Sequence, residues 1–161
     1  FFENKNLLEN VKTILNSYGI KLIVLEKFNK TPVDGYSFWS ENNPTIVLSM
    51  RYKRLDNLAF TLFHELGHVF LHLSENKDFK FLDIDDKENT VYENEADHFA
   101  RTQLISESIW KKIGAIKFPC EDKLILKVAK EYHIHPAIIF GRMCYEHNNY
   151  KVFTKIEREI K

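Results

Sequence analysis

Residues 55–73 read LDNLAFTLFHELGHVFLHL. Apolar side chains recur in this stretch at the spacing of an α-helix and cover most of its circumference. They are Leu55, Leu58, Ala59, Leu62, Phe63, Leu66, Val69, Phe70 and Leu73. A helix that is apolar over so much of its surface is normally buried on several sides. We therefore expect a core helix from about residue 54 to about residue 73.

Within this apolar stretch lie His64, Glu65 and His68. Residues four apart on a helix project from the same face, so the two histidines can offer ring nitrogens to one metal ion. Zinc suits such ligands, and a site with three protein ligands keeps one position open for water. Glu65 follows the first histidine, where its carboxylate can accept a proton from that water. The alternative, two histidines on an exposed helix face, conflicts with the apolar helix, because unpartnered polar groups are costly inside a protein.

Gly67 lies within the same motif, between Glu65 and His68. Glycine in a helix interior costs about 1 kcal/mol relative to alanine. A close approach by another backbone would explain why the side chain is absent. We therefore expect a second chain segment to pass close to Gly67.

The segment ENEADHFA at residues 93–100 supplies the third ligand. On a helix, Glu93, Ala96, Asp97 and Ala100 share one face. Glu93 would complete a site of two histidines and one glutamate, and Asp97 would accept the remaining N–H of a ligating histidine. The small alanines would let the two helices approach closely. The alternative, a solvated acidic stripe, explains the charges but not the alanines.

Three further residues are weaker candidates. Glu95 lies on another face of the second helix. His72 extends the histidine face by one turn, and we interpret it as the polar end of the helix, because a fourth ligand there would close the water position. Tyr36 falls in a predicted strand and is a candidate to polarise a substrate carbonyl. The alternative for Tyr36 is an ordinary core aromatic.

Hydropathy patterns predict the other elements of the chain. Helices are expected over 5–18, 91–105, 121–132 and 136–147, a short element over 110–116, strands over 21–28, 36–39 and 44–50, and a charged connection over 74–90. One helix, three strands and then several helices indicate an α+β domain. We expect a single domain over 1–161, with a small three-stranded sheet packed against the helical bundle that carries the histidine motif.

The composition is that of a packed globular protein, with 44% hydrophobic and 14% aromatic residues. Lys plus Arg (23) balance Asp plus Glu (23), so no global field draws the chain to nucleic acid or to an anionic membrane. No apolar run approaches the length of about 18–20 residues that spans a bilayer. The N-terminus lacks the pattern of a signal peptide. Cys120 and Cys144 are isolated, so we expect two reduced thiols and a cytoplasmic protein.

The two motifs together resemble the ImmA/IrrE family of zinc metallopeptidase domains. Residues 57–72 are similar to the active-site helix of that family, and residues 93–100 to its glutamate helix. Residues 44–57 and 129–142 are similar to a subgroup that is fused behind a helix-turn-helix DNA-binding domain and often labelled as antidotes of HigA type. A chain of this subgroup that begins at a phenylalanine is expected to be the C-terminal part of a longer regulator.

The resemblance implies a zincin-like fold, bound zinc and hydrolysis of peptide bonds. Carried over by position, it implies that His64, His68 and Glu93 are metal ligands and that Glu65 is the general base. The implied partner is a protein or peptide substrate, such as a helix-turn-helix repressor or an antitoxin. Neither direct nucleic-acid binding by this region nor a membrane is expected.

Two other functions remain open from the sequence. A regulatory or antitoxin module could keep the zinc for structure or sensing and bind a partner without cutting it. A plain helical domain without metal is the third reading. The leading hypothesis is a zinc-dependent endopeptidase.

Overall fold

The computed structural model describes residues 5–26, 33–78 and 90–160, and the backbone of 80–82. In this part of the chain four strands form one mixed sheet with the order β1-β3-β2-β4. The strands are β1 (Lys21–Leu25), β2 (Gly35–Ser40), β3 (Asn43–Ser49) and β4 (Lys80–Leu82). β1 runs parallel to β3, whereas β2 is antiparallel to both β3 and β4. The three predicted strands are present, although residues 27–28 of the first lie outside the described part.

The fourth strand corrects one expectation, because β4 lies in the segment predicted as a charged connection. Its three residues pair with Tyr36, Ser37 and Phe38 of β2. A strand this short carries too little alternation to be recognised from sequence. β4 forms the edge of the sheet beside β2.

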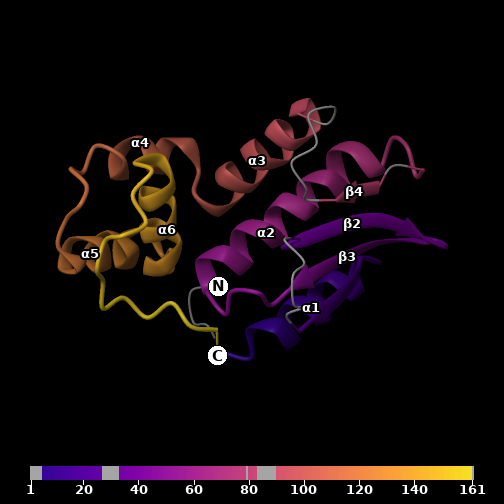
Figure 1. Ribbon diagram of the computed structural model, residues 1–161, viewed down its shortest axis with the longest axis horizontal. Coiled ribbons are helices and arrows are strands. Elements are labelled where there is room, and N and C mark those ends of the chain that lie inside the picture. Colours follow the sequence, from indigo (N-terminus) through magenta and orange to yellow (C-terminus); the bar gives the residue numbers. More distant parts are fainter. Residues whose placement is uncertain (1–4, 27–32, 79, 83–89, 161) are drawn as a thin grey trace.

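The helices follow the predicted order along the chain. They are α1 (Leu7–Ser17), α2 (Leu55–Gly67), the π-helical segment η1 (His68–Leu73), α3 (Thr90–Leu104), α4 (Glu107–Ile113), α5 (Asp122–Tyr132) and α6 (Pro136–Glu146). Figure 1 shows α2 through the middle of the molecule, with the sheet on one side, α3 on another and α4–α6 grouped at one end. The α+β fold of zincin-like type is therefore confirmed.

The core lies around α2, which packs against α3, α6, β3 and β2. Ile46 of β3 and Leu55 of α2 are fully buried. From α6, Ile139, Phe140 and Met143 are also almost completely buried. Burying each large apolar side chain contributes about 1.5–3 kcal/mol. The helix with the histidine motif is thus held from several sides, as its sequence predicts.

The C-terminal residues return to the beginning of α2. The backbone N–H of Leu55 donates to the carbonyl of Arg158 over 2.7 Å. The guanidinium groups of Arg54 and Arg158 both bind the carboxylate of Asp56, which is only 9% exposed. Gly141 of α6 faces the same carboxylate, and a Cβ there would lie 2.7 Å from Asp56 Oδ2. These contacts fix the N-terminal end of the helix that carries the site.

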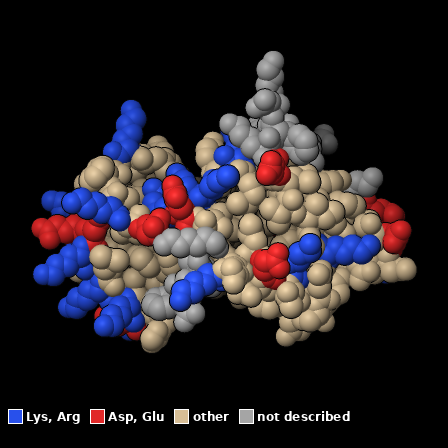
Figure 2. Space-filling model, turned by 90° about the horizontal axis from the view of Figure 1, so that it is seen from below, with Lys and Arg blue, Asp and Glu red and all other residues tan. Residues whose placement is uncertain are grey.

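The surface shows a local charge pattern that the balanced composition conceals. Figure 2 shows Lys and Arg side chains gathered over the end formed by α4–α6, with acidic side chains among them. The exposed lysines of this end are Lys111, Lys112, Lys117, Lys123, Lys127 and Lys130. No helix within the described ranges combines the length and hydropathy needed to cross a membrane. Both cysteines are free thiols, as predicted.

Candidate metal centre

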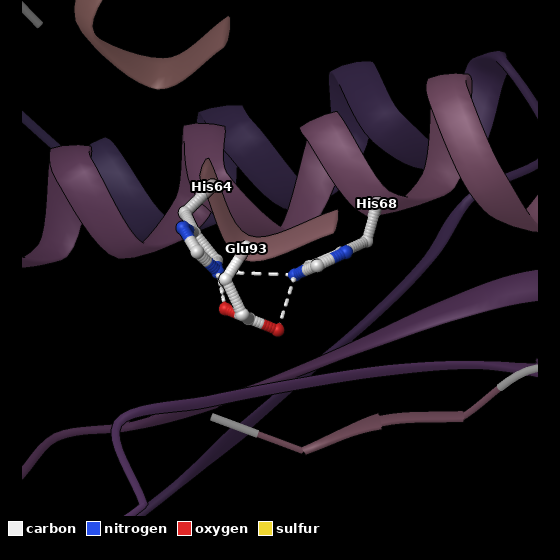
Figure 3. Close-up of side chains that lie close together, drawn as sticks. All are labelled: His64, His68 and Glu93. Carbon is white, nitrogen blue, oxygen red and sulfur yellow. Dashed lines mark hydrogen bonds and ion pairs between the residues drawn. The ribbon is translucent and has the colours of Figure 1, made fainter. Parts of the chain in front are cut away.

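Two histidines and one glutamate converge where α2 meets α3. His64 Nε2 and His68 Nε2 lie 3.1 Å apart. The Glu93 carboxylate reaches both rings, with Oε2 3.1 Å from His64 Nε2 and Oε1 3.4 Å from His68 Nε2. Figure 3 shows the His64 ring of α2 and the His68 ring at the start of η1 projecting toward this carboxylate. One donor atom from each residue lies within 4.8 Å of the others, so a single metal ion fits this donor set.

The close packing of α2 against α3 brings Glu93 to the histidines. Ala96 and Ala100 of α3 are fully buried, and Ala96 lies directly against Gly67. The predicted close approach at Gly67 is therefore confirmed, and Ala96 is the residue at which α3 meets it. A larger side chain at any of these positions would push Glu93 away from the histidines.

Asp97 lies behind His64, one helical turn after Glu93. Its Oδ1 is 3.0 Å from His64 Nδ1, the ring nitrogen that does not face Glu93. The guanidinium of Arg101 lies 3.5 Å from the other carboxylate oxygen. A metal at His64 Nε2 requires the ring proton on Nδ1, where it would be donated to Asp97. The structure thus places Asp97 at the position that the sequence predicted.

The charges of the cluster favour a cation at its centre. Burial by itself lowers the pKa of His64, but hydrogen bonds with Asp97 and Glu93 outweigh it and raise this pKa to about 10. Burial raises the pKa of Glu93, but hydrogen bonds with His64 and His68 outweigh it and lower this pKa to about 2. Burial lowers the pKa of His68. Asp97 and Glu93 therefore stabilise positive charge on the His64 ring, whereas burial favours the neutral form of His68.

Glu65 is the most deeply buried acid of the site, at 1% exposure. Its carboxylate lies against Gly35 of β2, where an added Cβ would overlap Glu65 Oε1. The same carboxylate is close enough to His64 to raise the pKa of that ring. β2 therefore holds Glu65 beside the first candidate ligand.

A protein-family model described as the IrrE N-terminal-like domain, a peptidase family designated M78, matches residues 16–135. The chain belongs to this family. The match covers both motifs and the sheet, so the resemblance drawn from residues 57–72 and 93–100 is confirmed. Membership supports a function of the metallopeptidase type, and the cluster of His64, His68 and Glu93 provides a site that could bind a metal. No curated protein matches the chain.

In this IrrE-like domain Tyr36 does not join the cluster. Gly35 and Ser37 are buried, and Gly35 faces α2. Because side chains alternate along a strand, Tyr36 and Phe38 point to the opposite face of β2. Their rings stack there with centroids 5.1 Å apart. The structure thus places Tyr36 away from the metal ligands, contrary to the expectation.

The IrrE-like domain also brings His72 and Glu95 together beside the cluster. His72 lies in the last turn of η1, as predicted, but it is buried, at only 4% exposure. Its Nδ1 lies 3.0 Å from His68 Nδ1, and its Nε2 lies 3.0 Å from Glu95 Oε2. The four-residue spacing from His68 to His72 was visible in the sequence. The contact with Glu95 was not, because it depends on how α3 lies against η1.

A cavity of about 150 Å³ lies between α2, α3 and α6, and none of the candidate ligands lines it. Its lining includes Asn57 and Phe60 of α2, and Arg101 and Leu104 of α3. The ring of Phe60 lies 6.2 Å from that of His64, centroid to centroid. The IrrE-like domain therefore has a recess, lined by apolar and charged side chains, one helical turn from His64.

Proposed function

We propose that this domain is a zinc-dependent endopeptidase that cleaves a protein partner. The observation that carries the proposal is the convergence of His64, His68 and Glu93, with the buried carboxylate of Glu65 beside them. The donor set of two imidazoles and one carboxylate is typical of catalytic zinc sites. Membership of a peptidase family supports hydrolysis as the reaction.

His64, His68 and Glu93 would hold the zinc, and Asp97 would hold the His64 ring in the required tautomer. The chemistry that bound zinc supplies is Lewis-acid polarisation of the peptide carbonyl and acidification of a water. Glu65 would accept a proton from the attacking water at a carboxylate oxygen. It would then donate that proton to the nitrogen of the leaving amine.

The substrate would bind in an extended conformation along β4, the edge strand beside β2. An edge strand offers unpaired backbone groups, and a peptide that adds to it gains main-chain hydrogen bonds. One substrate side chain would enter the cavity lined by Phe60 and Leu104. These two features predict selection for an extended segment with an apolar side chain near the cleaved bond.

The partner that we propose is a regulatory protein of repressor or antitoxin type in the cytoplasm. This part of the proposal rests on residues 44–57 and 129–142, which are similar to the subgroup fused to helix-turn-helix domains. In such a fusion the domain would act on its partner without binding DNA itself.

Co-expression tests the proposal. The full-length protein is produced together with the proteins encoded beside its gene, and mass spectrometry identifies new termini. We expect cleavage of one partner, loss of cleavage in Glu65→Gln, and unchanged cleavage in the exposed control Glu131→Gln. Full cleavage by Glu65→Gln would contradict the mechanism. Stoichiometric zinc without cleavage of any partner would instead support the non-catalytic regulatory module.

A further inference from the structure

We propose that His72 and Glu95 position His68 as a metal ligand, in a second hydrogen-bonded chain beside the one from Asp97 to His64. The inference rests on the metal centre of the proposed function and adds two residues to it. Each ligating histidine would then have a hydrogen-bond partner at the ring nitrogen that does not face the metal. For His64 this partner is a carboxylate, and for His68 it is a neutral imidazole backed by a carboxylate.

The positions of the ring nitrogens exclude His72 as a fourth ligand in the observed arrangement. His68 turns Nε2 toward His64 and Glu93, and turns Nδ1 toward His72. His72 therefore meets His68 on the side of the ring opposite the cluster. The second nitrogen of His72 is directed at Glu95, at 3.0 Å. This leaves the open coordination position of the proposed zinc site to water or substrate.

The two contacts fix the proton positions along the chain. A metal bound at His68 Nε2 requires the ring proton on Nδ1, which must then donate. His72 Nδ1 is the atom that faces it, so His72 must accept there and carry its own proton on Nε2. That proton is donated to the Glu95 carboxylate over the 3.0 Å contact. One arrangement of protons satisfies all three residues, and it is the arrangement in which His68 can bind metal.

Burial makes His72 difficult to replace by solvent. His68 is 1% exposed and His72 is 4% exposed. The ring of Tyr92 packs edge-on against His72, with the centroids 4.9 Å apart. Without His72, the His68 Nδ1–H would lose the acceptor that faces it, and a buried donor without an acceptor costs about 1–3 kcal/mol. Glu95 is half-exposed, so the hydrogen-bonded chain from His68 through His72 ends at the protein surface.

The local helix geometry supports the contact. η1 begins at His68 and is π-helical through Leu73. The wider turns of a π-helix bring residues four apart closer to one line along the helix, which places the His72 ring over the His68 ring. Single π-turns occur frequently at functional sites. A π-helical segment that begins at a candidate ligand is consistent with a positioning role for His72.

Cobalt binding tests this inference without an activity assay. Chelator-treated protein is titrated with Co²⁺, and the visible absorption reports both affinity and ligand geometry. His72→Phe keeps a ring but removes the acceptor, and we expect it to lower Co²⁺ affinity about 10–100-fold and to alter the spectrum. His72→Gln retains one acceptor and one donor, so it should recover most of the affinity. The exposed His98→Phe is the matched control and should bind as the wild type does.

The outcomes separate this inference from the proposed function. If the wild type binds Co²⁺ and His72→Phe binds it with equal affinity and the same spectrum, the positioning role is wrong while the metal centre stands. If the wild type binds no Co²⁺, the metal centre itself fails. If His72→Phe does not fold, Glu95→Ala decides, because its half-exposed side chain can be removed without opening the core. A loss of affinity in Glu95→Ala would support the chain, and unchanged affinity would overturn it.

Discussion

Gly67 of α2 and Ala96 of α3 lie so close together that a Cβ at residue 67 would come within 2.9 Å of Ala96 Cα. The nearest atom belongs to the backbone, so no side-chain rotation can relieve the contact. Ala96 follows Glu93 by one helical turn, and the same packing brings Glu93 to His64 and His68. The absence of a side chain at Gly67 is therefore a condition for the metal centre.

Gly67→Ala should separate the two helices. We expect the free energy of unfolding to fall by about 1–3 kcal/mol, as for other overpacked cores. This loss would exceed the gain in helix propensity, which is about 1 kcal/mol. We also expect weaker zinc binding, because Glu93 would be pushed away from the histidines. Urea denaturation measures the stability, and a zinc titration measures the affinity. Adding Ala96→Gly should not restore either quantity, because Ala96 Cα is the atom in the way. Wild-type stability and zinc affinity in Gly67→Ala would show that the helices do not meet here.

Asp97→Asn should weaken zinc binding about 10–100-fold, because the support for the His64 ring loses its charge. The amide oxygen can still accept from His64 Nδ1, so the fold should persist. A competition titration against a coloured chelator measures the affinity. Asp78→Asn, an exposed aspartate outside the cluster, is the control. Equal affinities in the two variants would remove Asp97 from the site.

Gly35→Ala should displace the Glu65 carboxylate, because Gly35 of β2 lies directly against it. An added Cβ would overlap Glu65 Oε1 and lie 2.8 Å from Thr61 Cγ2. We expect a loss of stability in urea denaturation and a loss of cleavage, with zinc retained. In a Glu65→Ala background the same substitution should cost less stability, because the overlapping carboxylate is gone. A double-mutant cycle measures this coupling. The same cost in both backgrounds would contradict the contact.

The two cysteines should differ in reactivity. Burial raises the pKa of the Cys144 thiol to about 11, and Cys144 is 1% exposed. Cys120 is partly exposed. Because the thiolate is the reactive form, a thiol reagent should modify Cys120 first, and faster as the pH rises from 7 to 9. Cys144 should react only after unfolding. Equal rates for both thiols in the folded protein would contradict the burial of Cys144.

The convergence of the candidate ligands was largely predictable because these residues obey helical periodicity. The spacing from His64 to His68 and from Glu93 to Asp97 defines two faces, and Gly67 indicated that the faces meet. Helical periodicity cannot distinguish an α-helix from the π-helical turn at His68–Leu73, since the same residues are apolar in both. The contact between His72 and Glu95 depends on that turn and on the packing of α3. It could therefore not be derived from the sequence.

The sheet was less predictable than the helices. Alternation shows which residues of a strand share a face, but not which face meets the core. In β2 the aromatic residues Tyr36 and Phe38 suggested the core face, yet the structure turns Gly35 and Ser37 toward α2. The small residues are needed there because the Glu65 carboxylate occupies the space. The buried carboxylate of Glu65 thus reversed the expectation based on hydropathy.

Metal analysis of the purified domain tests the central claim most directly. We predict stoichiometric zinc in the wild type, retention of zinc in Glu65→Gln, and its loss in Glu93→Ala. Retention of zinc in Glu65→Gln would show that Glu65 is not a metal ligand, as its proposed role as general base requires. A wild type that takes up no zinc, or a Glu93→Ala variant that holds it as tightly, would contradict a centre formed by His64, His68 and Glu93.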